Sequence, residues 1–422
     1  MTTFVLFASF FILMILSVPI GIALGLSGLL TALVSPNISM SFLVQGLITS
    51  TDNFALLAIP FFILAGEIMG KGGISNRLFD LANVMVGRVT GGFAIAAVIT
   101  CMFFAAISGS GPATVAAVGG IMIPAMVAQG YDKKFATAII VTAGSLGIIL
   151  PPSIPMVLYG ISGNQSIGDL FLGGVLPGIL IGILLMIWSY IYSKKKGYHG
   201  SSEAFSFKKL LSALNAAKWS LLIPVIILGG IYGGIFTPTE AAVIAVVYAG
   251  IISLFAYKEI SFRSLPRIMA DASVSSVAIL IIIGTANTFG KILTLEDIPS
   301  TIANAFLSVS TDPMLIVFLL IALLLFIGLF IDTSAAVIIF TPILLPVAIE
   351  VGLDPIHFGI IMIVTLAIGF ITPPLGVNLF VGSSISGIGV PQLVKASIPF
   401  FFVMLFGLII IALIPSITLL LL

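Results

Sequence analysis

The amino-acid sequence predicts an all-helical protein that crosses a membrane many times and is built from two inverted repeats. Of its 422 residues, 60% are hydrophobic and only 7% are charged, whereas about a quarter of the residues of a soluble domain are charged. The mean hydropathy of +1.33 agrees with this composition. In addition, charges gather in short clusters between long apolar runs, and one stretch of the sequence recurs at a constant offset. A soluble protein is therefore excluded.

Uncharged runs mark the expected membrane helices. A crossing needs about 20 apolar residues, which limits the chain to about a dozen crossings, and the alternating pattern of membrane barrel strands is absent from the sequence. The first run lacks the basic start of a signal peptide and is long enough to cross once or twice, so we expect it to stay in the membrane. In chain order the runs are 4–34, 54–69, 89–131, 135–168, 170–193, 219–239, 241–257, 272–290, 313–331, 333–349, 358–394 and 396–422.

The charges between these runs predict the orientation of the chain. The loop 194–218 holds six lysines and a single glutamate, and 71–88 and 258–271 are also more basic than acidic. Lys and Arg concentrate on the cytoplasmic side of membrane proteins. We therefore expect these three loops inside, and the acidic loop 291–312 and the segment from Glu350 to Asp354 outside.

An internal repeat divides the chain into halves. A shift of 222 residues pairs Pro124 with Pro346 and brings the double proline at 151–152 onto the one at 373–374. Five expected crossings separate equivalent loops, and because five is odd the halves are expected to be inverted, which is typical of secondary transporters. The predicted parts are a first repeat 1–193 (hairpin about 90–131, broken helix about 135–162), a basic connector 194–218, and a second repeat 219–422 (hairpin about 313–350, broken helix about 357–386).

Four polar interruptions break the apolar runs, at 107–114, 149–153, 330–336 and 371–378. Proline cannot donate to the helix ladder, so the double prolines free backbone carbonyls. Irregular backbone persists at membrane depth only where protein buries it or where it lines a polar cavity. Carbonyl and hydroxyl oxygens suit a hard cation. Because these groups do not titrate, a sodium-sized ion fits them better than a proton.

Each of these features also has a purely structural interpretation. The small residues at 108–111 could serve close helix packing, but the repeat places Ser110 opposite Asp332, which favours an ion or substrate role. Asp332 could instead cap a turn at the water interface. The paired arms fit either a re-entrant hairpin or two full crossings, and their length of 17 to 19 residues favours the hairpin. For Glu240, which follows Pro238, a helix-capping role is favoured over a role in coupling.

Other functional classes lack support in the sequence. The lone Cys101 allows neither a disulfide nor a cysteine metal site, and the net charge of +1 offers no field for nucleic acid. The sequence holds no nucleophile–base pair, metal cluster or nucleotide-binding motif. We therefore expect neither an enzyme nor a resident cofactor.

Several separated motifs resemble the large membrane subunit of the tripartite ATP-independent periplasmic (TRAP) transporters, a family of the ion-transporter superfamily. They are PFFILAGEIM (60–69), SGSGPATVAAVG (108–119), LPPS (150–153), GIFTPTEAAV (234–243) and TPPLGVNLF (372–380). The resemblance implies a multi-pass protein of the bacterial inner membrane that imports an organic acid with sodium by an elevator motion. It also implies a periplasmic substrate-binding protein and a small four-helix membrane subunit, here expected as a separate polypeptide.

The resemblance further implies where ions and substrate bind, at two pairs of a hairpin tip and a helix break. The substrate is expected to be a C4-dicarboxylate or a sialic acid, with the overall likeness leaning toward sialic acid. The alternative is a stand-alone ion-coupled antiporter or exporter of the same superfamily. The implied sodium and substrate residues are Ser108, Ser110, Gly111, Ser145, Gly147, Pro151 and Ser153 in the first half, and Asp332, Thr333, Ser334, Gly369, Thr372, Pro373 and Asn378 in the second.

Overall fold

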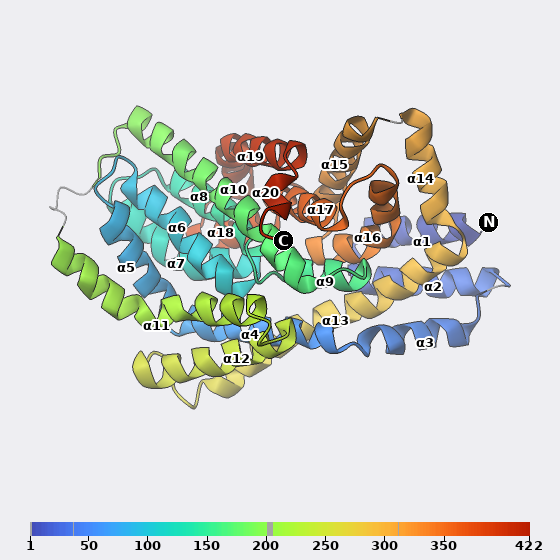
Figure 1. The fold of residues 1–422 in the computed structure, drawn as a ribbon, viewed down its shortest axis with the longest axis horizontal. Coiled ribbons are helices and arrows are strands. Elements are labelled where there is room, and N and C mark those ends of the chain that lie inside the picture. The colour runs from blue at the N-terminus through green and yellow to red at the C-terminus, as the bar shows by residue number, and fades with distance from the viewer. Residues whose placement is uncertain (1, 37, 201–205, 311) are drawn as a thin grey trace.

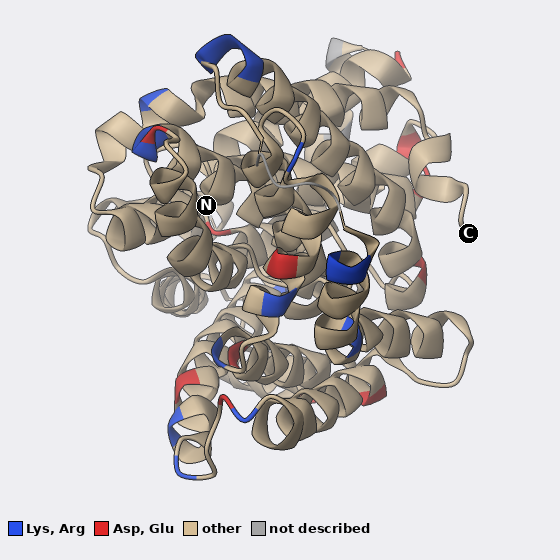
Figure 2. Ribbon diagram, turned by 90° about the vertical axis from the view of Figure 1, so that its left-hand side faces the viewer, with Lys and Arg blue, Asp and Glu red and all other residues tan. Residues whose placement is uncertain are grey.

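The computed structural model describes residues 2–36, 38–200, 206–310 and 312–422, and the regular secondary structure of this part of the chain is helix only, without a strand (Figure 1). Nine of the described helices are long and apolar enough to cross a membrane. Figure 2 shows how sparsely the fold is charged. The predicted all-helical, multi-pass membrane architecture is thereby confirmed.

The helices of the first half run from α1 to α10. Their bounds are α1 (Thr2–Ile15), α2 (Ile20–Val34), α3 (Met40–Thr51), the short η1 (Phe54–Leu57), α4 (Ala58–Lys71), α5 (Ile74–Val86), α6 (Gly92–Ser108), α7 (Gly111–Ala128), α8 (Lys133–Gly144), η2 (Ser145–Ile148), α9 (Ile154–Ser162) and α10 (Ile167–Lys196). Those of the second half are α11 (Phe207–Tyr232), α12 (Pro238–Ile251), the π-helical turn η3 (Ile252–Ala256), α13 (Leu265–Leu295), α14 (Ile298–Val309), α15 (Pro313–Phe330), α16 (Thr333–Glu350), α17 (Pro355–Gly369), α18 (Val377–Ser386), α19 (Val390–Leu413) and α20 (Ser416–Leu419).

Three of these helices lie between the uncharged runs, in segments where the sequence predicts no membrane helix. Ser39 starts α3, because its side chain accepts a hydrogen bond from the backbone N–H of Phe42 at 3.2 Å. Helix α5 lies within the basic segment 71–88 and buries Leu78 and Leu81. Helix α14 lies within the acidic segment 291–312. The first apolar run, 4–34, forms two helices, and the second of them begins after Pro19.

Most of the helices pack as two groups. We call α2, α3, α4, α11, α12 and α13 the long-helix layer, in which α4 packs on α12 and α13 packs on α2, α3 and α4. We call α6–α9 and α15–α18 the broken-helix group, in which α6, α7 and α8 pack together and α16 packs on α9 and α17. In Figure 1 the layer runs along the lower side of the molecule and the group lies above it. The groups touch where α4 meets α6 and α7 and where α13 meets α16.

Helix bounds recur between the halves at the offset of 222 residues. Helix α7 begins at Gly111 and ends at Ala128, and α16 begins at Thr333 and ends at Glu350, which are the equivalent positions. The pairs α6 and α15, α8 and α17, and α9 and α18 correspond within a few residues at one end or both. This correspondence supports the repeat, while its inversion stays a prediction.

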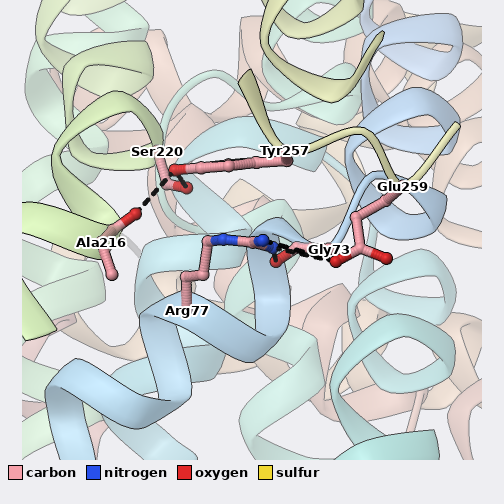
Figure 3. Close-up of polar contacts among 6 residues, drawn as sticks. All are labelled: Gly73, Arg77, Ala216, Ser220, Tyr257 and Glu259. Atoms are coloured by element: carbon pink, nitrogen blue, oxygen red, sulfur yellow. Dashed lines mark hydrogen bonds and ion pairs between the residues drawn. The ribbon is translucent and has the colours of Figure 1, made fainter. Parts of the chain in front are cut away.

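Polar contacts join α5 to the loop that follows η3, and join that loop to α11 (Figure 3). The guanidinium of Arg77 on α5 donates to the carbonyl of Gly73 at 2.8 Å and lies 3.4 Å from the carboxylate of Glu259. It also stacks 3.8 Å from the ring centre of Tyr257, whose hydroxyl donates to the carbonyl of Ala216 on α11 at 3.1 Å. Cation–π and charge-assisted contacts of this kind stabilise helix ends that have few apolar partners.

The predicted connector 194–218 is mostly helical. Lys194, Lys195 and Lys196 form the last turn of α10, and α11 begins at Phe207. Residues 201–205, which include Glu203, lie outside the described residues. Basic residues in the last turn of a helix interact favourably with its dipole, so these lysines stabilise the end of α10. They also carry the positive charge that predicts a cytoplasmic location for this loop.

Candidate functional site

The first polar turn joins α6 to α7. Gly109 adopts a φ of +62°, which reverses the chain after Ser108. The Ser108 hydroxyl lies 3.0 Å from that of Thr114, which donates to the carbonyl of Ser110 at 2.8 Å. Ser110 caps α7, because its side chain accepts from the backbone N–H of Ala113 at 3.4 Å. Three hydroxyls and a carbonyl therefore meet in one turn.

The first helix break lies directly against this turn. The backbone N–H of Ile154 donates to the carbonyl of Gly109 at 3.3 Å. The Ser153 hydroxyl donates to the carbonyl of Ile148 at 2.6 Å and caps α9. A Cβ at Gly147 would collide with the carbonyl of Ser110, so only glycine allows this close approach. The turn and the break between η2 and α9, with its cis Pro151–Pro152 bond, thus form one polar unit.

The second half repeats this arrangement with different side chains. The carboxylate of Asp332 caps α16 by accepting from the backbone N–H of Ser334 at 2.9 Å. The break after α17 contacts the end of α15 through a hydrogen bond from the N–H of Leu375 to the carbonyl of Leu329 at 3.0 Å. The Thr372 hydroxyl donates to the carbonyl of Ile368 at 2.7 Å. Here Pro373 is exposed, whereas Pro151 in the first break is buried.

Asn378 connects the two units. Its amide Nδ2 donates to the carbonyl of Val141 at 3.0 Å and to the hydroxyl of Ser145 at 3.2 Å, both of which belong to the first half. The side chain is fully buried, and its Oδ1 has no hydrogen-bond partner within the described residues. A Cβ at Gly111 would lie 3.4 Å from this oxygen. A buried, unpaired amide oxygen is costly unless something else binds it.

The structure thus brings together most of the expected site residues. Ser108, Ser110, Gly147 and Ser153 share the first unit, and Gly111, Ser145 and Asn378 meet at the junction between the halves. Thr333 and Ser334 form the first turn of α16 after Asp332, and Gly369 packs against Gly328 close to the second break. Sequence reasoning missed Thr114 and the carbonyl of Val141. The position of Thr114 four residues after Ser110 was an available signal, since such pairs face one another on a helix.

Glu240 lies apart from these units. Its carboxylate accepts hydrogen bonds from the backbone N–H and the hydroxyl of Thr237, at 2.8 and 2.9 Å. In return the Thr237 hydroxyl accepts from the N–H of Glu240 at 3.3 Å. These are the reciprocal contacts of a capping box at the start of α12. They are the contacts that the capping interpretation predicts.

The family model and the similar proteins point to the same transporter family. The model of the tripartite ATP-independent periplasmic transporter, DctM component, matches residues 7–417. The isethionate TRAP transporter permease of Oleidesulfovibrio alaskensis is 49% identical over 98% of this chain, which spans only 65% of that protein's length. The C4-dicarboxylate TRAP transporter large permease of Pseudomonas aeruginosa is 44% identical over 94% of this chain and 93% of its own length.

A sialic acid relative and a solved structure lie further away. The sialic acid TRAP transporter large permease of Vibrio cholerae is 36% identical over 97% of this chain and 96% of its own. The YdaH transporter of Alcanivorax borkumensis has the same fold, with a TM-score of 0.65 over 89% of this chain and 88% of that one, at 16% identity. The chain belongs to the DctM family of TRAP transporters, which makes it a multi-pass permease of the bacterial inner membrane and not an enzyme.

Proposed function

We propose that this chain is the large subunit of a sodium-coupled importer of a small organic anion. The observation that carries the sodium part is the buried Oδ1 of Asn378, which has no partner within the described residues and lies beside the polar turn at Gly111. Close to it lie the hydroxyl of Ser145 and the carbonyl of Val141, to which the amide nitrogen of the same side chain donates. Neutral oxygens of this kind are ligands for a hard cation, and a bound sodium ion would satisfy the unpaired oxygen.

The substrate proposal rests on the relatives. The relatives named for isethionate and for C4-dicarboxylates are 49% and 44% identical to this chain, and the sialic acid relative is 36% identical. We therefore place a short-chain sulfonate or dicarboxylate ahead of a sialic acid, which reverses the leaning of the sequence resemblance.

The partners and the motion belong to the same proposal. A tripartite system supplies a small four-helix membrane subunit and a periplasmic binding protein, and this family membership disfavours a stand-alone antiporter or exporter. The two polar units lie within the broken-helix group, and the long-helix layer packs beside it. We propose that the two halves of the chain are inverted repeats, each with its re-entrant hairpin and broken helix in this group, and that the group slides against the layer, as rigid-body motion in such repeats requires.

A direct test is the thermal stability of the purified chain in different salts. A ligand that binds only the folded state stabilises it by mass action, by about 1.4 kcal/mol at ten times its Kd. We expect the Tm to rise with NaCl relative to equal concentrations of KCl and choline chloride. Asn378→Leu, which is similar in size but lacks the oxygen, should reduce the difference. Equal Tm values in NaCl and KCl would contradict sodium binding.

A further inference from the structure

A cavity with four polar side chains in its lining opens between the two polar units and the acidic segment 291–312. It has a volume of about 320 Å³ and lies between α3, α9, α13 and α16. On α13 it is lined by Asn287, Lys291 and Thr294, which are spaced by four and three residues and therefore share one face of the helix. The lining also includes Ser162 at the end of α9 and Ile338 on α16.

Lys291 is an isolated cation. It is the only Lys or Arg in residues 268–394, and residues 1–70 have none. It is half-buried, and its Nζ donates to the hydroxyl of Thr49 at 3.3 Å. Within the described part of the chain it has no carboxylate partner, unlike Lys71, which pairs with Asp271 at 2.8 Å. A partly desolvated ammonium without a counter-charge attracts an anion from solution.

Besides Lys291, the cavity offers neutral side chains that can donate hydrogen bonds to an anion. Carboxylate and sulfonate oxygens accept hydrogen bonds but cannot donate them, so the protein has to supply the donors. The side chains of Asn287 and Ser162 are half-buried and make no hydrogen bond with the described residues. The volume lies at the lower end of the range of about 300–1,000 Å³ for ligand pockets, which suits an anion of a few carbon atoms.

The position of the cavity connects it to both polar units. Ile338 is six residues beyond Asp332 on α16, and Ser162 is nine residues beyond Ser153 on α9. At 1.5 Å per residue the cavity lies about 9 to 14 Å along each helix from its polar turn. Lys291 is four residues before the end of α13, where the chain enters the acidic segment with Glu296 and Asp297. The cavity therefore lies between the expected outer surface and the two units.

We propose that this cavity is the entry site for the transported anion, in which Lys291 binds its carboxylate or sulfonate and Asn287 and Ser162 donate hydrogen bonds. The inference rests on the proposed import of an organic anion. Lys291 belongs to the long-helix layer, and Ser162 and Ile338 belong to the broken-helix group. An anion in the cavity bridges the two groups, so it is released from Lys291 when the group slides inward.

The test is protection of a single cysteine at the cavity wall. Leu295 lines the cavity and is 59% exposed, so we replace it by cysteine in a Cys101→Ala background and label it with an impermeant thiol reagent. Isethionate and succinate should each slow the labelling, whereas the neutral ethylene glycol should not. With Lys291→Met the half-protecting concentration should rise by about tenfold or more, the usual effect of losing a charged hydrogen bond. With Lys291→Arg protection should remain.

Matched variants keep the test decisive. Lys395→Met removes an exposed lysine on α19, distant in sequence and outside the cavity lining, and should leave protection unchanged. If Lys291→Met does not fold, Asn287→Leu should still raise the half-protecting concentration. Absence of protection by isethionate, succinate and N-acetylneuraminate, or equal protection with Lys291→Met, would overturn the inference. Labelling requires neither a sodium gradient nor the partner subunits, so this result and the failure of sodium-driven uptake can be told apart.

Discussion

At the scale of single residues, the equivalent positions Ser110 and Asp332 differ in charge. Both side chains cap the helix that follows, α7 in one case and α16 in the other. A carboxylate supplies a full negative charge where the hydroxyl supplies only a dipole. If both turns bind sodium, the turn at Asp332 should bind it more tightly, because a charged ligand offsets more of the cost of dehydrating the ion.

Replacing either residue should therefore impair uptake without unfolding the protein. We expect Ser110→Ala and Asp332→Ala to lower sodium-driven uptake by about tenfold or more, since each removes a charged or strongly polar ligand. The measurement is initial uptake as a function of sodium concentration in proteoliposomes. Ser39→Ala is the matched control, because it removes the cap of α3, remote in sequence from both turns, at a cost of about 1 kcal/mol. Normal rates and normal sodium dependence in both test variants would refute the site.

The contacts of Asn378 mark the limit of prediction at this scale. The double prolines and the 222-residue offset indicated both breaks and the residues around them. The bond from Asn378 to the carbonyl of Val141 could not be predicted, since a backbone carbonyl has no sequence signature and the two residues are 237 positions apart. Tertiary packing alone decides which carbonyl meets the amide.

At the scale of elements, strong local signals located the helix ends at the polar turns. The polar turns at 108–111 and 330–333 separate α6 from α7 and α15 from α16, as the interruptions predicted. The sequence did not predict α5 and α14, because helices were expected only in long uncharged runs. Charged residues in or beside these two helices interrupt the runs. The burial of Leu78 and Leu81 on one side of α5 shows that a helical period was present and could have been read.

Glu240 offers a test that separates capping from coupling. Glu240→Gln keeps an oxygen that can accept from the Thr237 N–H, whereas Glu240→Ala removes the cap. We expect the Tm to fall more for Glu240→Ala than for Glu240→Gln, and sodium-driven uptake to stay normal for Glu240→Gln. The Tm is measured on the purified chain, and uptake is measured in proteoliposomes. Loss of uptake in Glu240→Gln at an unchanged Tm would instead assign this carboxylate to coupling.

At the scale of the whole molecule, the proposed elevator motion requires the broken-helix group to slide against the long-helix layer. A Cβ at Gly70 on α4 would lie 3.7 Å from the Cβ of Ala117 on α7, which is within the range for a disulfide. Crosslinking Gly70→Cys to Ala117→Cys in a Cys101→Ala background should therefore stop uptake, and reduction should restore it. Stabilisation by sodium should persist, because both polar units move as one body.

The control for this crosslink stays within the layer. A Cβ at Gly25 on α2 would lie 3.9 Å from the Cβ of Thr285 on α13, and both helices belong to the part that we expect to stay fixed. The pair Gly25→Cys and Thr285→Cys should crosslink without affecting uptake. Full uptake with the bond between α4 and α7 intact would favour a local gating motion over sliding.

The central claim is sodium-coupled import of an organic anion by this chain with two partners. Its most direct measurement is uptake of radiolabelled isethionate and succinate into proteoliposomes that contain the chain and its small subunit. We expect uptake only when an inward sodium gradient and the periplasmic binding protein are both present, and none when potassium replaces sodium. Uptake that proceeds equally without sodium or without the binding protein would contradict the account.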